Sequence, residues 1–338
     1  MKKHIDWKII VGFVISLLFL YLAFRQVDLK QMGNAFGKAN YWYLLPVLVV
    51  LLFSHLIRAI RWGYLIAPIG KVGIGNLYSA LIIGYMANTF VPAHLGEIFR
   101  AYVVGRKNNI PSSAVFGTVV MERILDVFSL LILMGLTLIV YPFPDWVKKS
   151  GYISFAVIMV LFLGLILLKI FHGPGLALLQ KVLGILPENL ANSLFHLVKS
   201  FLDGIVPLKK WHHYLMVLVL TVIMWTCYAF MFHLSFYAFD FVNRYDLPWM
   251  AALVMLVVTT ISIAVPSSPG YVGTYHYLCQ QGLDWFGIPQ SEALSFAIVA
   301  HAINFIPVLL LGFVFLYFEG LSFKNLRKKP GGVVPESD

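Results

Sequence analysis

Long apolar stretches recur along the 338-residue chain, and they constrain its fold more than any other feature. The hydrocarbon core of a bilayer is about 30 Å thick, so a helix needs about 20 apolar residues to cross it. Six uninterrupted stretches approach or exceed this length: 9–24, 44–66, 113–140, 152–170, 213–239 and 291–318. Only 12% of the residues are charged, which is about half of the share usual in soluble domains. The pattern predicts an all-α, polytopic integral membrane protein.

Two further apolar segments, 76–104 and 249–286, are each interrupted near the middle by proline and glycine. Non-helical backbone at membrane depth is tolerated only where it is buried in protein or lines a water-filled cavity. Each segment is therefore expected to form a re-entrant helix hairpin or two short spans, for a total of about eight membrane segments. The residues expected at the two breaks, lining a cavity, are Pro92, Gly96, Pro266, Ser267, Pro269, Gly270 and Gly273.

The distribution of lysine and arginine indicates the orientation, because cytoplasmic loops carry an excess of these residues. Basic residues gather at the N-terminus, in 169–213 and in the C-terminal tail, whereas the loop 240–248 is acidic on balance. We therefore expect both termini in the cytoplasm and 240–248 outside. If both interrupted segments are hairpins, 76–104 enters from inside and 249–286 from outside. Opposed interrupted segments are the arrangement of an inverted repeat and point to a transporter site.

The chain is predicted to form one transmembrane domain, 1–320, followed by a disordered basic cytoplasmic tail, 321–338. Apolar side chains in 188–206 recur on one helical face, which predicts an amphipathic helix on the cytoplasmic membrane surface. The net charge of +10 comes from basic residues that flank apolar segments, so nucleic-acid binding is not expected. The sequence contains neither a metal-ligand spacing nor a nucleotide-binding glycine motif, and we expect no metal or cofactor.

Ionisable residues inside the apolar segments are the candidate functional residues, since each costs about 2.5–3.5 kcal/mol at a helix centre. Arg58 and Arg61 share one helical face near the end of 44–66. They either snorkel to cytoplasmic headgroups or belong to a polar site. Glu97 and Arg100 follow the first break, where the alternatives are a weak surface ion pair and an anion site at a helix N-terminus.

A third cluster, formed by Glu122, Arg123 and Asp126, occupies one arc of the predicted helix 113–140. Such a cluster is untenable against lipid, so it must face protein, as a structural pin, or a wet cavity. We expect the two acidic–basic clusters to line one shared polar cavity. The residues assigned to this candidate substrate-binding site are Glu97, Arg100, Glu122, Arg123, Asp126, Asn88, Arg58 and Arg61.

Four of these features, in this order, together resemble a known family. They are Arg-x-x-Arg-Trp at 58–62, the string from Asn88 to Arg100, Glu122-Arg123 with Asp126, and the proline–glycine break at 266–273. The family is the flippase-like transmembrane domain of the lysylphosphatidylglycerol synthase/flippase proteins, also called the UPF0104 group, and the resemblance covers about 5–320. It implies a multi-pass protein of the bacterial or archaeal cytoplasmic membrane that moves, or helps to move, an amphiphilic lipid between leaflets. The soluble aminoacyl-transfer domain of the best-known members is not expected here.

The resemblance favours a transporter rather than an enzyme, with membrane lipids as its partners: an anionic or aminoacylated phospholipid, or a lipid-linked sugar. The arginines independently suit a phosphate headgroup, because guanidinium groups bind phosphate through two parallel hydrogen bonds. Two alternatives remain open. One is a membrane-embedded transferase for a lipid-linked substrate, with Glu97 or Asp126 as the base. The other is a non-catalytic accessory subunit of a glycosyltransferase or lipid-synthesis complex.

Cysteine accessibility tests the predicted orientation. Single cysteines are introduced as His4→Cys, Asn243→Cys or Pro330→Cys into a chain whose Cys227 and Cys279 are replaced by serine. A membrane-impermeant thiol reagent added to intact cells should label position 243 alone, and positions 4 and 330 should become reactive after permeabilisation. Labelling of position 330 from outside would contradict the predicted topology.

Overall fold

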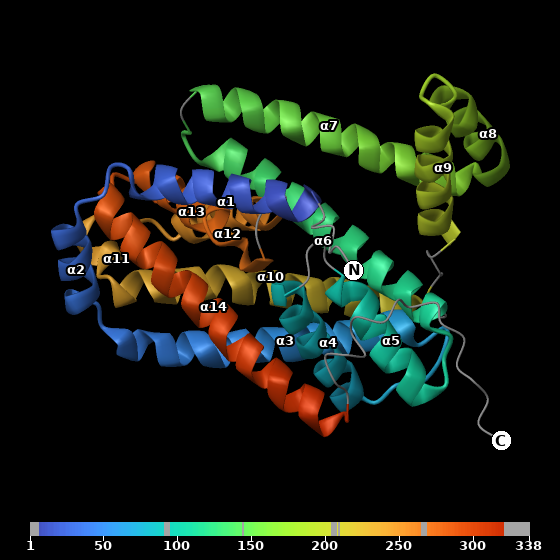
Figure 1. Ribbon diagram of the computed structural model, residues 1–338, viewed down its shortest axis with the longest axis horizontal. Coiled ribbons are helices and arrows are strands. Elements are labelled where there is room, and N and C mark those ends of the chain that lie inside the picture. Colours follow the sequence, from blue (N-terminus) through green and yellow to red (C-terminus); the bar gives the residue numbers. More distant parts are fainter. Residues whose placement is uncertain are drawn as a thin grey trace, which may run out of the picture.

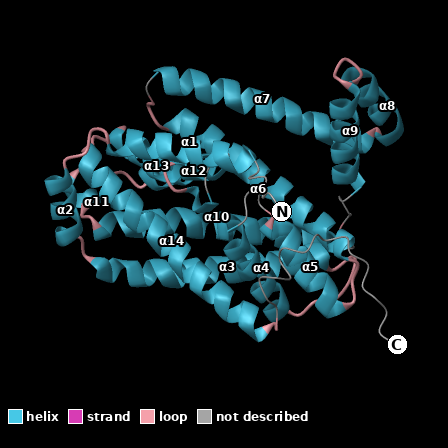
Figure 2. Cartoon of the chain, in the orientation of Figure 1, coloured by secondary structure: helices cyan, strands magenta, loops and turns pink. Residues whose placement is uncertain are grey.

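The computed structural model describes residues 7–90, 95–143, 145–203, 208, 210–264 and 269–320, and every regular element in these ranges is helical (Figures 1 and 2). Five helices are long and apolar enough to cross a membrane, and a bent pair at the N-terminus gives a sixth if it counts as one span. The long helices are α3 (Leu44–Ile66), α6 (Ser112–Val140), α7 (Asp145–Ile170), α10 (Trp211–Ala238) and α14 (Gln290–Phe318). The predicted all-α polytopic membrane fold is confirmed.

The bent pair consists of α1 (Trp7–Phe24) and α2 (Leu29–Lys38), which meet at an angle of 85° between their described parts. Asp28 causes the turn locally, because its carboxylate accepts hydrogen bonds from the first backbone N–H groups of α2. α2 then packs against α14, where Ser295 donates a hydrogen bond to the carbonyl of Met32 at 3.3 Å. The sequence analysis predicted the span but not α2.

The first interrupted segment is a helix hairpin formed by α4 (Ile74–Phe90) and α5 (Gly96–Asn108). Gly84 and Gly96 lie at the crossing: a Cβ atom built on Gly84 would be 2.9 Å from the carbonyl oxygen of Gly96. The side chain of Asn88 closes the break, since its Oδ1 accepts a hydrogen bond from the Gly96 backbone N–H at 2.7 Å. Pro92, which was expected in this break, lies outside the described residues.

The second interrupted segment consists of α12 (Met250–Ala264), the 3-10 turn η2 (Pro269–Tyr271) and α13 (Thr274–Asp284). α12 and α13 also fold back on each other, and Gly282 of α13 lies against Met255 of α12. Gly270 and Gly273 have φ angles of 78° and 96°, which suit glycine and allow the sharp change of direction before α13. Pro266 and Ser267 lie outside the described residues, and Pro269 begins η2.

Neighbouring helices hold the second break in place. His301 of α14 is hydrogen bonded through Nε2 to the carbonyl of Gly270 at 2.9 Å. The hydroxyl of Ser16 in α1 donates to the carbonyl of Val272 at 2.6 Å. Backbone groups that leave a helix inside a membrane need such partners, because lipid offers none. The carbonyl groups of Gly270 and Val272 therefore have protein partners, as expected for a break at membrane depth.

The two hairpins enter the bundle from opposite ends (Figure 1). The open end of α4 and α5 lies with the end of α14, where Lys107 pairs with Glu319 at 2.8 Å. The open end of α12 and α13 lies with the end of α6, where the Tyr141 hydroxyl donates to the carbonyl of Trp285 at 3.0 Å. η2 packs against α4, so the second break reaches the first hairpin. The opposed entry predicted from the sequence is present in the structure.

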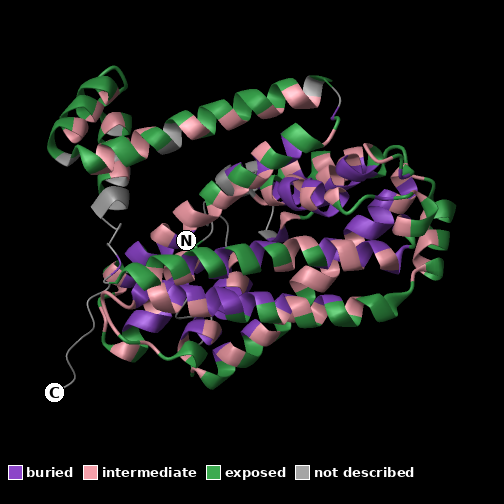
Figure 3. Ribbon diagram, turned by 180° about the vertical axis from the view of Figure 1, so that it is seen from behind, coloured by how far each residue is buried: buried purple, intermediate pink, exposed green. Residues whose placement is uncertain are grey.

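An arm of three helices extends from the bundle, with most of its residues exposed (Figure 3). It consists of α7, α8 (His172–Leu183) and α9 (Glu188–Asp203), and the short α11 (Phe241–Arg244) lies at the other end of the molecule. α7 packs against α6, and α9 contacts both of these helices. The predicted amphipathic helix over 188–206 is observed as α9, and its last expected residues, 204–206, lie outside the described residues.

Replacement of Gly96 by alanine tests the hairpin packing. The added methyl group would overlap the Gly84 carbonyl and lie 2.6 Å from Asn88 Oδ1, so α4 and α5 must separate. Overpacking of this kind costs about 1–3 kcal/mol, and the apparent melting temperature in detergent should fall. Gly75→Ala is the matched control, because it lies in α4 with open space around its Cβ position. Equal stability of the two variants would contradict the described packing.

A buried arginine–carboxylate network as candidate functional site

Seven ionisable side chains from three helices form one continuous network of ion pairs. They are Arg58 and Arg61 of α3, Glu97 and Arg100 of α5, and Glu122, Arg123 and Asp126 of α6. The helical spacing brings them together, since residues three or four positions apart share one face. The structure thus unites seven of the eight side chains that the sequence analysis assigned to a substrate site.

Glu122 is the centre of the network, and its side chain is 0% exposed. Arg100 donates one hydrogen bond to each of its carboxylate oxygens, both at 3.2 Å. Arg58 and Arg123 each donate to Oε1 at 2.8 Å. One carboxylate therefore binds guanidinium groups from all three helices and fixes their relative positions.

Asp126, one turn further along α6, binds both arginines of α3. It accepts a hydrogen bond from Arg61 at 2.7 Å and a very short one from Arg58. Arg58 and Arg61 are 7% and 0% exposed at their side chains, so the interpretation that they snorkel to headgroups is wrong. Both turn towards the carboxylates of α6 because a buried guanidinium needs paired acceptors.

Residues that were not predicted complete the surroundings of the arginines. The hydroxyl groups of Tyr228 and Thr221 in α10 accept hydrogen bonds from Nη1 of Arg58 and Arg61, respectively, each at 3.2 Å. The two residues are seven positions apart and therefore share one face of α10, a signal that was available in the sequence. Arg100 stacks over the ring of Trp62, with 4.8 Å between its Cζ and the ring centroid, a geometry of cation–π attraction.

The Glu97–Arg100 surface pair considered from the sequence is also wrong. Arg100 is buried and binds Glu122, whereas Glu97 lies 3.3 Å from Nε of Arg123 in the next helix. The contact between Glu97 and Arg123 joins the two predicted clusters directly. Asn88 lies beside the network but bonds the Gly96 backbone instead. The residues expected to line one cavity therefore form one ion-pair network, with Asn88 at its edge.

The network has one unbalanced positive charge and one more open side. Four guanidinium groups, which stay protonated in proteins, face three carboxylates. The side chains of Arg123 and Glu97 are 35% and 20% exposed, whereas the other arginines are nearly inaccessible. Tyr271 of η2 is within electrostatic range of both residues, so the second break borders this open side. The arrangement can attract an anion at Arg123.

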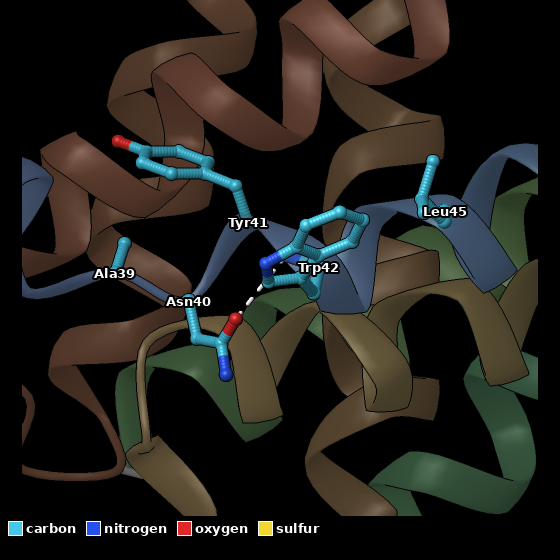
Figure 4. A pocket seen from close by; sticks show the side chains of 5 residues that line it. All are labelled: Ala39, Asn40, Tyr41, Trp42 and Leu45. Carbon is cyan, nitrogen blue, oxygen red and sulfur yellow. Dashed lines mark hydrogen bonds between the residues drawn. The ribbon is translucent and has the colours of Figure 1, made fainter.

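Other features of the described residues provide fewer groups that could bind a charged ligand or a metal. A hollow of about 450 Å³ is lined by Ala39, Asn40, Tyr41, Trp42 and Leu45 (Figure 4). None of these side chains carries a charge at neutral pH, and the 77% exposure of Trp42 is typical of a membrane interface. The part of the chain that the structure describes contains no group of three metal-ligating side chains.

Comparison with known proteins places the chain among membrane proteins. The model of a family described as the lysylphosphatidylglycerol synthase TM region matches residues 9–312. A UPF0104 membrane protein of Methanothermobacter thermautotrophicus is 21% identical over 337 residues, a match that covers 95% of this chain and 97% of the relative. No solved structure matches.

Glu122→Gln tests whether the network supports the fold. The amide removes the charge that three arginines share, and breaking a buried ion pair typically costs about 3–5 kcal/mol. The apparent melting temperature of the detergent-purified protein should fall strongly. Glu292→Gln is the control, because Glu292 binds the 45% exposed Arg244, and such pairs contribute about 1 kcal/mol or less. Equal losses in the two variants would show that the network adds no particular stability.

Proposed function

Because the chain belongs to the lysylphosphatidylglycerol synthase transmembrane-region family, we propose that it moves an anionic amphiphilic lipid between leaflets and binds the headgroup at the arginine–carboxylate network. The observation that carries this proposal is the excess positive charge of the network, whose most exposed cation, Arg123, lies where the two interrupted hairpins approach each other. Ionisable residues at membrane depth commonly line substrate pathways, because burying a charged side chain in the bilayer costs free energy.

The chemistry of the arginines supports a phosphate-bearing headgroup. A guanidinium group offers donors in a planar fork that matches phosphate oxygens. The buried Nε atoms of Arg61 and Arg100 have no hydrogen-bond acceptor among the described residues, so the network retains unused donors. A zwitterionic or glycosylated lipid with a phosphodiester presents the same group.

The two hairpins supply a route for alternating access. Among the described contacts, Asn88 closes the first break, while His301 and Ser16 hold the second. Transporters with interrupted helices expose a fixed central site to either side by movement of one repeat against the other. Here α4–α5 and α12–α13 enter from opposite ends, so movement of either hairpin opens the network towards a different leaflet.

The paired state of the carboxylates favours transport over group transfer. Glu97 and Asp126, the candidate bases, are both engaged by arginines. A general base must lie within hydrogen-bond reach of the proton that it abstracts, and these carboxylates are turned towards arginines instead. Transport needs no such base, and the ion pairs instead provide exchangeable partners for an arriving anion.

Flipping assays in proteoliposomes of the purified protein test the proposal. Anionic, zwitterionic and glycosylated phospholipids are compared, and we expect the anionic lipid to move fastest. Arg123→Gln and Glu97→Gln should abolish movement with little change in melting temperature, because both side chains are partly exposed. Arg100→Lys should retain part of the activity, since an ammonium group keeps the charge but lacks the guanidinium fork.

Arg244→Gln is the matched control, because it removes an arginine–carboxylate pair at the far end of the molecule, and it should move lipid at the wild-type rate. Movement of lipid by Arg123→Gln at that same rate would refute the assignment of the site. Failure of the folded wild-type protein to move any tested lipid would refute transport and favour the accessory-subunit alternative.

A further inference from the structure

The described side-chain contacts between α7 and α6 lie in the first half of α7. A Cβ atom built on Gly151 would lie 2.7 Å from a methyl group of Leu138, and one built on Gly135 would lie 3.3 Å from the Phe155 ring. Among the described side chains, Met159 is the last residue of α7 in this apolar cluster. The α6-facing stripe of α7 continues at helical spacing to Ile166 and Ile170, which are 40% and 66% exposed.

The opposing stripe of α6 is uncovered over the same stretch. Leu131 and Leu138 of this stripe belong to the cluster that includes α7. Val127 lies one turn before Leu131 and is 44% exposed. Arg123 and then Phe116, which is 37% exposed, continue the stripe towards the start of the helix. Successive steps of four and seven residues place these side chains on one face. The half-exposed guanidinium of the network is therefore flanked by apolar side chains on the α7 side of α6.

The arm closes this region at one end. α9 contacts both α6 and α7, so the two helices remain linked beyond the point where they separate (Figure 1). Two uncovered apolar stripes thus run beside a cation, between helices that are joined at both ends. Inside a bilayer, apolar surface is covered by acyl chains, and a charged side chain there needs a counter-charge. Arg123 already contacts Glu97, Glu122 and Asp126, but the network as a whole keeps one excess positive charge. An anionic lipid supplies both an acyl chain for the stripes and the negative charge that balances this excess.

We propose that one acyl chain of the transported lipid binds between the second half of α7 and the first half of α6, with its anionic headgroup at Arg123. This inference rests on the proposed function and adds the path of entry, which is lateral, from the bilayer, past Val127 and Ile166. The uncovered stripes lie at the end of the bundle where α4 and α5 enter. The lipid therefore enters from the leaflet at that end, which the positive-inside rule assigns to the cytoplasm.

Photolabelling locates the acyl chain. Phosphatidylglycerol and phosphatidylcholine analogues with a diazirine in one acyl chain are reconstituted with the full chain, and labelled residues are identified by mass spectrometry. Labelling at Val127 and Ile166 should be stronger with the anionic analogue and should fall about tenfold in Arg123→Gln, as expected for the loss of one charge-assisted hydrogen bond. Val222 of α10, which is 58% exposed, is the control for bulk lipid and should label equally with both analogues.

Filling the entry path gives a second, independent measurement. Val127→Trp and Ile166→Trp should slow lipid movement without lowering the melting temperature, whereas Val222→Trp should leave the rate unchanged. The entry path is wrong if lipid moves, labelling at Ile166 is the same with both headgroups, and the tryptophan variants transport normally. The proposed function then stands. If no lipid moves while headgroup-dependent labelling persists, the binding path stands and transport fails.

Discussion

A fully buried carboxylate in a membrane protein needs cations around it, and Glu122 meets this requirement by drawing arginines from three helices. Moving an ion out of water costs several kcal/mol even after relaxation, so the contacts of Glu122 must be satisfied together. Through Glu122, Arg58 links α3 to α6, and Arg100 links the first hairpin to α6. The position of Arg100 depends in turn on the glycine contact between α4 and α5. The fold and the candidate site therefore share one set of interactions.

The sequence predicted the individual helices better than it predicted which helices and side chains contact one another. Hydropathy located the long helices and both interrupted segments, and helical periodicity placed Glu122, Arg123 and Asp126 on one arc. These features are properties of single segments, which one sequence reveals. The 85° bend before α2 went unpredicted, because it depends on the cap at Asp28 and on packing against α14.

Pairing between helices was harder to predict, for a physical reason. In lipid, an apolar face indicates neither which neighbour a helix has nor which side faces the protein, since acyl chains are as apolar as the interior. From sequence alone, Arg58 and Arg61 therefore fit snorkelling as well as burial. The carboxylates of α6 beside them decide for burial. Glu97 has Arg100 one turn away in sequence, yet it contacts Arg123 across a helix interface. Only the packing of α5 against α6 distinguishes these partners.

The carboxylates have a further consequence for the proposed transport. Four unpaired arginines would hold a phosphate headgroup too firmly for release, because permeation through any site requires binding that is favourable but readily reversed. Three carboxylates leave one positive charge, and they compete with the headgroup for the same donors. The pair between Arg123 and Glu97 is the natural point of exchange: it is the most exposed contact of the network, and Nε of Arg123 lies 3.3 Å from the carboxylate without forming a hydrogen bond. An arriving phosphate can take the place of Glu97 there while Glu122 keeps the buried arginines in position. In the proposed transport, the exposed pair serves binding and release, while the buried pairs hold the three helices together.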